Sequence, residues 1–174
     1  MILLPQPASL SYGEGTFTIH YNSRIFLDSE SPASLYFAAQ LLQQEIEKQT
    51  GFCLAICRRH QPLGGHLIYL TTSPELSRES YTLTVTSDRV TICGSPESGV
   101  LYGVQTLRQM IRQAGAVLPS VLISDSPAME NRGFYHDVTR GRVPTLSYLK
   151  QLADTLSFYK INQLQLYIEH SYLF

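Results

Sequence analysis

The sequence lacks tryptophan, long apolar runs and an excess of either charge. Its 13 Lys and Arg residues are scattered against 14 Asp and Glu, so no basic face is available to neutralise phosphates. No apolar stretch approaches the roughly 20 residues that cross a bilayer, and Pro5 follows Met1–Leu4 before a signal-peptide core can form. We therefore expect neither nucleic acid nor a membrane as a partner. The sequence slightly favours the cytoplasm over secretion, and the compartment stays open.

Cysteine and histidine are too few and too dispersed to build a covalent or metal framework. Three cysteines make no disulfide framework. Cys53 and Cys57 fall in one predicted strand, about 13 Å apart, beyond the roughly 7 Å that a disulfide tolerates. The five histidines show neither H-x-H nor H-E-x-x-H spacing. We expect free thiols, no metal site and no cofactor.

Apolar alternation predicts strands in the first two thirds of the chain. Residues 17–21 and 24–27 flank an Asn22-Ser23 turn, which predicts a β-hairpin. Residues 81–85 and 90–92 flank Ser87-Asp88, which predicts a second hairpin.

Two apolar stripes at helical spacing predict helices in the same region. The first helix is expected to begin with a Ser31 cap and Pro32 and to end near Gly51. The second is expected to begin after Pro96 and to end before Gly115. These elements predict an α+β fold with a mixed, largely antiparallel sheet and two helices on one face.

The pattern changes after Ser126-Pro127. Residues 133–138 and 164–168 are predicted strands, and a helix capped by Thr145 lies between them. Parallel strands joined by a helix need cover on both faces, which two strands and one helix cannot supply. We therefore predict one domain over residues 1–126 and an incomplete β-α-β unit over residues 127–174.

Two motif stretches carry a family resemblance. Residues 99–109 read G-V-L-Y-G-V-Q-T-L-R-Q; D-S-P follows at 125–127, R-G-F-Y-H-D-V-T-R at 132–140 and K-I-N at 160–162. Together they resemble the β-N-acetylhexosaminidases of glycoside hydrolase family 20. The first stretch is similar to the end of that family's N-terminal non-catalytic accessory domain. The second is similar to the linker and the first β-α-β of its (β/α)8 catalytic barrel, truncated here.

The resemblance implies an enzyme that removes terminal β-linked N-acetylhexosamine with retention, using the substrate's acetamido oxygen as nucleophile. In the family, an adjacent Asp-Glu pair after the fourth barrel strand orients the acetamide and supplies the general acid. These 174 residues contain no Asp-Glu dipeptide. We therefore expect the chain to hold no catalytic residue and to be inactive alone.

The expected partner of the complete enzyme is a glycan that contains N-acetylhexosamine. The exposed barrel segment also makes self-association of the chain an expected behaviour. The alternative is a non-catalytic structural or carbohydrate-binding module of another glycosidase.

Four residues are candidates for substrate binding. The resemblance aligns Arg140 with the arginine that holds the C3 and C4 hydroxyls of the sugar, and a guanidinium offers several donors in a fixed fork. Asp137 is expected to orient Arg140 through a charge-assisted hydrogen bond. The family's second strand commonly ends W-H-L-x-D-D, whereas this chain has L-Y-I-E-H-S at 166–171. Glu169 and His170 are expected to bind outer hydroxyls in place of the missing acidic pair.

Overall fold

The computed structural model describes residues 1–59, 64–96 and 98–169 of the chain. It divides into two compact units, Met1–Pro127 and Ala128–Phe174. The elements are, in chain order, β1 (Ser9–Thr18), β2 (Arg24–Leu27), α1 (Leu35–Thr50), β3 (Ala55–Arg58), β4 (Leu67–Thr72), β5 (Tyr81–Val85), β6 (Arg89–Gly94), α2 (Gly99–Ala114), β7 (Val117–Asp125), β8 (Gly133–Asp137), α3 (Leu146–Phe158) and β9 (Gln163–Tyr167).

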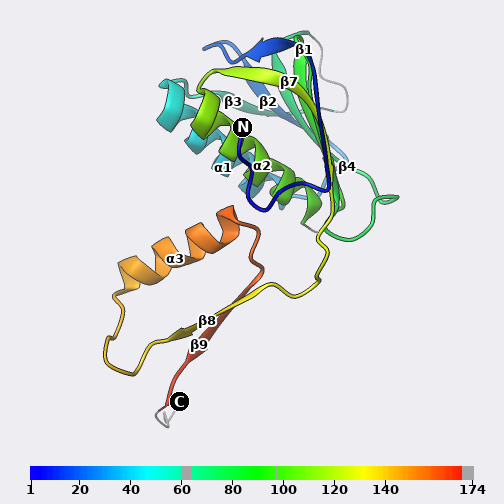
Figure 1. Cartoon of the computed structure of the whole chain (residues 1–174). Helices are drawn as coiled ribbons and strands as arrows, with labels where there is room; N and C mark the ends of the chain where they lie inside the picture. Colours follow the sequence, from blue (N-terminus) through cyan, green and yellow to red (C-terminus); the bar gives the residue numbers. More distant parts are fainter. Residues whose placement is uncertain (60–63, 97, 170–174) are drawn as a thin grey trace. The chain divides into compact units, whose positions relative to one another are not determined.

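The first unit contains a seven-stranded mixed sheet in the order β1-β7-β5-β6-β4-β2-β3 (Figure 1). The pairs β1–β7, β7–β5 and β5–β6 are antiparallel. The pairs β6–β4, β4–β2 and β2–β3 are parallel. The sheet is mixed, as predicted, but half of its pairings are parallel, so the expectation of a largely antiparallel sheet was wrong.

The hairpin predicted around Asn22-Ser23 does not form. β1 pairs instead with β7, and β2 lies between β3 and β4 in parallel register. A local turn redirects the chain, because Ser23 N–H donates to the His20 carbonyl and Ser23 Oγ accepts from His20 N–H. Alternating apolar residues determine which face of a strand is buried, but they do not determine which other strand pairs with it. The second predicted hairpin is confirmed as β5–β6.

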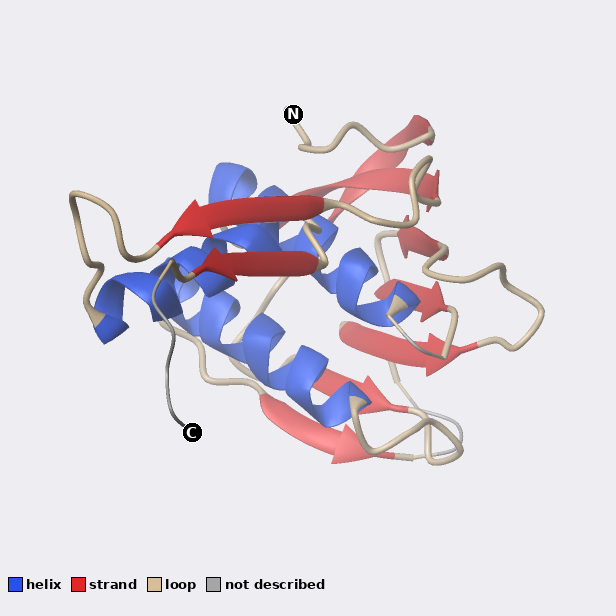
Figure 2. Ribbon diagram, turned by 90° about the horizontal axis from the view of Figure 1, so that it is seen from below, coloured by secondary structure: helices blue, strands red, loops and turns tan. Residues whose placement is uncertain are grey.

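Helices α1 and α2 pack on one face of this sheet, as predicted (Figures 1 and 2). α1 begins at Leu35, later than predicted, because Leu35 N–H bonds to the Pro32 carbonyl in a tight turn. Gly51 ends α1 with a left-handed φ of 78°, a conformation that favours glycine, and Gly115 follows α2.

The spacing of the glycines around α2 reflects close contact between that helix and the sheet. A Cβ on Gly103 would lie 2.5 Å from Ile92 Cγ2, and one on Gly99 would lie 2.2 Å from the Ser80 carbonyl oxygen. Both distances are too short for any side chain. The G-x-x-x-G part of the first motif therefore serves helix-to-sheet packing.

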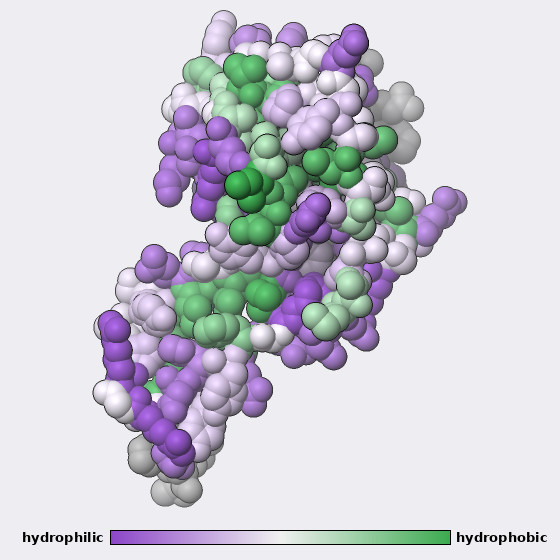
Figure 3. Space-filling view, viewed as in Figure 1, coloured by the Kyte–Doolittle hydropathy of each residue, from purple (hydrophilic) through white to green (hydrophobic). Residues whose placement is uncertain are grey.

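The second unit is a β-α-β arrangement. β8 and β9 are parallel, with Gly133 opposite Gln163 and Asp137 opposite Tyr167. Thr145 caps α3, as predicted, because its Oγ1 accepts from Tyr148 N–H at 3.2 Å. Apolar side chains remain visible on the surface of this unit (Figure 3). Among its described residues, Phe158 is the single buried hydrophobic side chain.

Across the described residues of both units, no helix combines the length and the hydropathy needed to cross a membrane.

Candidate functional site

The two strands of the second unit carry different chemistry on their two faces. Phe134 and His136 share one face, and the His136 ring lies 5.7 Å from the Tyr148 ring of α3. The opposite face carries Tyr135 and Asp137 on β8 and their register partners Gln165 and Tyr167 on β9. The face that carries Asp137 and the two tyrosines is therefore the one that points away from α3.

Asp137 builds a turn at the carboxyl end of β8. Its Oδ1 accepts the backbone N–H of Thr139 at 2.9 Å, that of Arg140 at 3.0 Å and the Thr139 hydroxyl at 3.2 Å. The hydrogen bonds from the Arg140 and Thr139 backbones lower the pKa of Asp137. The carboxylate therefore fixes where the main chain of Arg140 leaves the strand.

Glu169, just past the end of β9, holds the guanidinium itself. Arg140 Nε donates to Glu169 Oε2 at 2.8 Å and Nη2 donates to Oε1 at 2.7 Å, a bidentate pair that raises the pKa of Arg140. Asp137 Oδ2 is 4.0 Å from Nε, too far for a hydrogen bond. Asp137 thus acts on Arg140 through the hydrogen bond that it accepts from the Arg140 backbone N–H.

Tyr167 is a member of this cluster that the sequence analysis missed. Its hydroxyl accepts from Arg140 Nη2 at 3.3 Å, and its ring centroid lies 5.4 Å from the guanidinium carbon. The available signal was its position two residues before Glu169, which puts both side chains on one face of a strand. The cluster therefore unites Asp137, Arg140, Tyr167 and Glu169; His170 lies outside the described residues.

The other residues of the second motif stretch lie at the opposite, amino ends of the two strands. Arg132 N–H donates to Asn162 Oδ1 at 2.9 Å, and Asn162 N–H returns a bond to the Arg132 carbonyl at 3.0 Å. The Arg132 Nε donates to the carbonyl of Lys160, a buried residue with a left-handed φ of 62°. Arg132, Lys160 and Asn162 thus stabilise the strand ends, and the rim with Arg140 carries the exposed charges.

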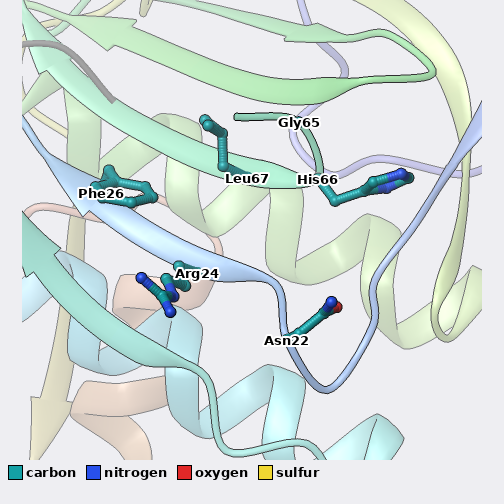
Figure 4. A pocket seen from close by; sticks show the side chains of 6 residues that line it. All are labelled: Asn22, Arg24, Phe26, Gly65, His66 and Leu67. Atoms are coloured by element: carbon teal, nitrogen blue, oxygen red, sulfur yellow. The ribbon is translucent and has the colours of Figure 1, made fainter. Parts of the chain in front are cut away.

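A concavity of about 250 Å³ lies in the first unit, where β2 and the start of β4 meet (Figure 4). Phe26 and Leu67 contribute apolar side chains, and Asn22, Arg24 and His66 contribute polar ones. These three polar residues are exposed, and their side chains make no hydrogen bond with any described residue. A polar binding site needs polar groups that hydrogen bonds hold in place, so we assign this concavity no chemistry.

A metal ion has no evident place in the part of the chain that the structure describes. No group of three or more His, Cys, Asp or Glu side chains there is arranged to hold one. Cys53, Cys57 and Cys93 are free thiols.

Comparison with known proteins identifies the family of the chain. The sequence profile described as "Glycosyl hydrolase family 20, domain 2" matches residues 1–126. The chain belongs to glycoside hydrolase family 20. The match covers most of the sequence, and it offers no support for a module of another glycosidase.

Several relatives of this family-20 chain are named β-hexosaminidases. It is 30% identical over 164 residues to a β-hexosaminidase of Vibrio furnissii, covering 92% of this chain and 25% of that protein. The structure of a family-20 β-N-acetylhexosaminidase from Streptomyces coelicolor A3(2) superposes with a TM-score of 0.82 at 26% identity, covering 94% of this chain and 34% of the other.

A third relative shows the same fold. The exo-β-N-acetylglucosaminidase of Vibrio harveyi, solved in complex with N-acetylglucosamine, superposes with a TM-score of 0.80 at 22% identity. The superposition covers 95% of this chain and 25% of that one. The family-20 chain therefore spans about a quarter to a third of the length of these relatives.

Proposed function

We propose that residues 1–126 are the non-catalytic accessory domain of a β-N-acetylhexosaminidase and that residues 127–174 open its (β/α)8 barrel. The complete enzyme removes terminal β-linked N-acetylhexosamine by substrate-assisted retaining hydrolysis. In it Arg140, Asp137, Glu169 and His170 serve substrate binding. The observation that carries this proposal is the Arg140–Glu169 pair, which lies just past the carboxyl ends of two adjacent parallel strands.

The two faces of β8 and β9 support the barrel proposal. In a (β/α)8 barrel each strand turns one face to its helix and the other to the barrel interior, and active sites form at the carboxyl ends of the strands. Here α3 lies against the face with Phe134 and His136, and the opposite face carries Tyr135 and Tyr167. An interior built of such residues, rimmed by Arg140, fits a site for a polar ligand.

The chemistry of Arg140 supports a sugar ligand. Its Nε and Nη2 are bonded to Glu169 and Tyr167, while Nη1 makes no hydrogen bond with any described residue. A planar guanidinium with one open edge can donate to the oxygens of two vicinal hydroxyls. Glu169 retains lone pairs that can accept from a hydroxyl beside it. Arg140 therefore supplies hydrogen-bond donors and Glu169 supplies acceptors. The hydroxyls of a diol can both accept and donate hydrogen bonds, so they can bind to both side chains.

The test is hydrolysis of a chromogenic N-acetyl-β-D-glucosaminide. The 174-residue chain should show no turnover, because it has no Asp-Glu pair. A polypeptide that continues this chain through a complete barrel should show turnover. In it, Arg140→Ala should lower kcat/KM at least about 100-fold, since two charge-assisted hydrogen bonds to substrate are lost.

The matched control is Arg142→Ala. Arg142 is exposed and lies two residues from Arg140, and its side chain makes no hydrogen bond with any described residue. This change should leave kcat/KM within about twofold of the unchanged enzyme, as expected for a surface substitution. Absence of turnover in the complete barrel, or equal effects of the two substitutions, would refute the proposed function.

A further inference from the structure

Arg140 lies on an aromatic side chain as well as beside a carboxylate. The Tyr167 ring centroid is 5.4 Å from the guanidinium carbon, within the distance at which a cation is attracted to a ring face. The hydroxyl of the same tyrosine accepts from Nη2 at 3.3 Å. The side chain of Arg140 is nonetheless 62% exposed. An exposed arginine has many rotamers, so contacts of this kind decide where its donors point.

The hydrogen bonds of Arg140 leave one edge of the guanidinium open. A guanidinium has five N–H donors. The Nε donor and one Nη2 donor bind Glu169, and the second Nη2 donor faces Tyr167. The two Nη1 donors have no acceptor among the described residues. Glu169 therefore fixes one edge, and Tyr167 limits rotation and tilt of the plane so that the Nη1 edge keeps one direction.

Tyr167 is itself supported from the neighbouring strand. Its ring centroid lies 5.7 Å from that of Tyr135 on β8, and the Tyr167 carbonyl accepts from Val138 N–H at 3.2 Å. Both its ring and its backbone are thus held by β8, the strand that delivers Arg140. The ring is therefore fixed relative to the main chain of Arg140.

We propose that Tyr167 is a positioning residue for Arg140: its ring and hydroxyl hold the guanidinium so that the Nη1 edge meets the hydroxyls of the sugar. This inference rests on the proposed function, because the sugar is the ligand in both. It assigns Tyr167 no contact with substrate. Its effect reaches the sugar through Arg140 alone, which makes it separable from a residue that only fills the barrel interior.

Two substitutions separate the contributions of the ring and the hydroxyl in the barrel-complete polypeptide. Tyr167→Phe keeps the ring and loses one exposed hydrogen bond, so KM should rise about threefold. Tyr167→Leu loses both contacts, so KM should rise about tenfold. In each variant kcat should stay within about twofold, because a binding contact equal in ground and transition states changes KM alone. Tyr159→Phe, the same chemical change at an exposed site outside the cluster, should alter neither.

The deciding measurement is a double-mutant cycle with Arg140→Ala. If Tyr167 acts through Arg140, Tyr167→Leu should cause no further loss of kcat/KM once Arg140 is alanine. Equal losses in both backgrounds, or no effect of Tyr167→Leu on the unchanged enzyme, would overturn the positioning role while the effect of Arg140→Ala still upheld the proposed function. No effect of Arg140→Ala would overturn both. Tyr167→Phe preserves the ring, so it serves as a control for a loss of kcat/KM that results from misfolding of the leucine variant.

Discussion

Two arginines eight residues apart show how neighbours decide the role of a side chain. Arg132 donates to the main-chain carbonyls of Lys160 and Met129, so its donors hold together the segments that precede the two strands. Arg140 is held by carboxylate and tyrosine side chains, and its Nη1 donors have no acceptor among the described residues. The same residue type is therefore structural at the amino ends of the strands and available for binding at their carboxyl ends.

A buried tyrosine gives a prediction for the first unit. The Tyr81 hydroxyl lies 2.7 Å from Thr106 Oγ1 and donates to Asp125 Oδ2 at 2.9 Å. Tyr81→Phe removes both of these hydrogen bonds, so the free energy of unfolding should fall by about 1–3 kcal/mol. Urea denaturation measures this change. Tyr21→Phe, at an 80% exposed side chain, should change it little.

The pH dependence at Tyr81 has a definite sign. Burial raises the pKa of Tyr81 above its ordinary value of 10, and the charge of Asp125 acts in the same direction. When the pKa of a group is higher in the native state than in the unfolded state, its contribution to stability is fully present at pH values below the unfolded-state pKa. That contribution is lost as the pH rises above the unfolded-state pKa. The unchanged chain should therefore lose stability above about pH 10 more steeply than Tyr81→Phe. Parallel alkaline curves would contradict this.

At the scale of elements, one carboxylate joins α1 to α2. Glu45 on α1 is 1% exposed and accepts from Arg108 and Arg112 on α2, with Arg112 Nε at 2.8 Å and Arg108 Nη2 at 3.0 Å. Gln49 on α1 adds a third donor at 3.1 Å. The arginine of the first motif stretch, Arg108, is thus used to hold the two helices together.

Removing this carboxylate should destabilise the pair of helices. Glu45→Gln removes the buried negative charge that Arg108 and Arg112 both bind, which should cost about 2–3 kcal/mol in the free energy of unfolding. The matched control is Glu47→Gln on the exposed side of the same helix, which should stay within about 0.5 kcal/mol. Chemical denaturation at pH 7 distinguishes them; equal midpoints would show that the ion pairs contribute nothing net.

The same carboxylate predicts an acid dependence. Burial raises the pKa of Glu45, but the hydrogen bonds from Arg112 and Gln49 and the charges of both arginines outweigh it and lower the pKa below its ordinary 4.5. When the pKa of a group is lower in the native state than in the unfolded state, its contribution to stability is fully present at pH values above the unfolded-state pKa. That contribution is lost as the pH falls through the native-state pKa. The unchanged chain should therefore lose stability more steeply than Glu45→Gln below about pH 4.5.

At the scale of the whole molecule, the two units differ in how much apolar surface they bury. Every buried hydrophobic residue in the described parts of the chain except Phe158 belongs to the first unit. In the second unit, Leu164, Leu166 and Ile168 are 37%, 41% and 46% exposed. Strands with exposed apolar side chains and unpaired edges tend to associate with another chain.

Self-association of the chain is therefore the expected consequence. Sedimentation velocity should show a weight-average mass that rises with protein concentration. Residues 1–127, which contain their own core, should remain monomeric over the same range. A full chain that stays monomeric at every concentration would show that the second unit covers its apolar surface without a partner.

The sequence by itself determined the elements that local chemistry specifies. The β5–β6 hairpin, the Gly51 end of α1 and the Thr145 cap follow from turn and cap residues that act within a few positions. The motifs also located Arg140 beside the end of β8.

Tertiary structure alone decided which strands became neighbours and which side chains met. The position of β2 between β3 and β4, and the union of Arg140 with Tyr167 and Glu169 from a strand 27 to 29 residues away, depend on long-range packing. Periodicity specifies the face of a strand, whereas its neighbours follow from the lowest free energy of the whole sheet. A charged side chain likewise takes its role from the groups that the fold brings to it.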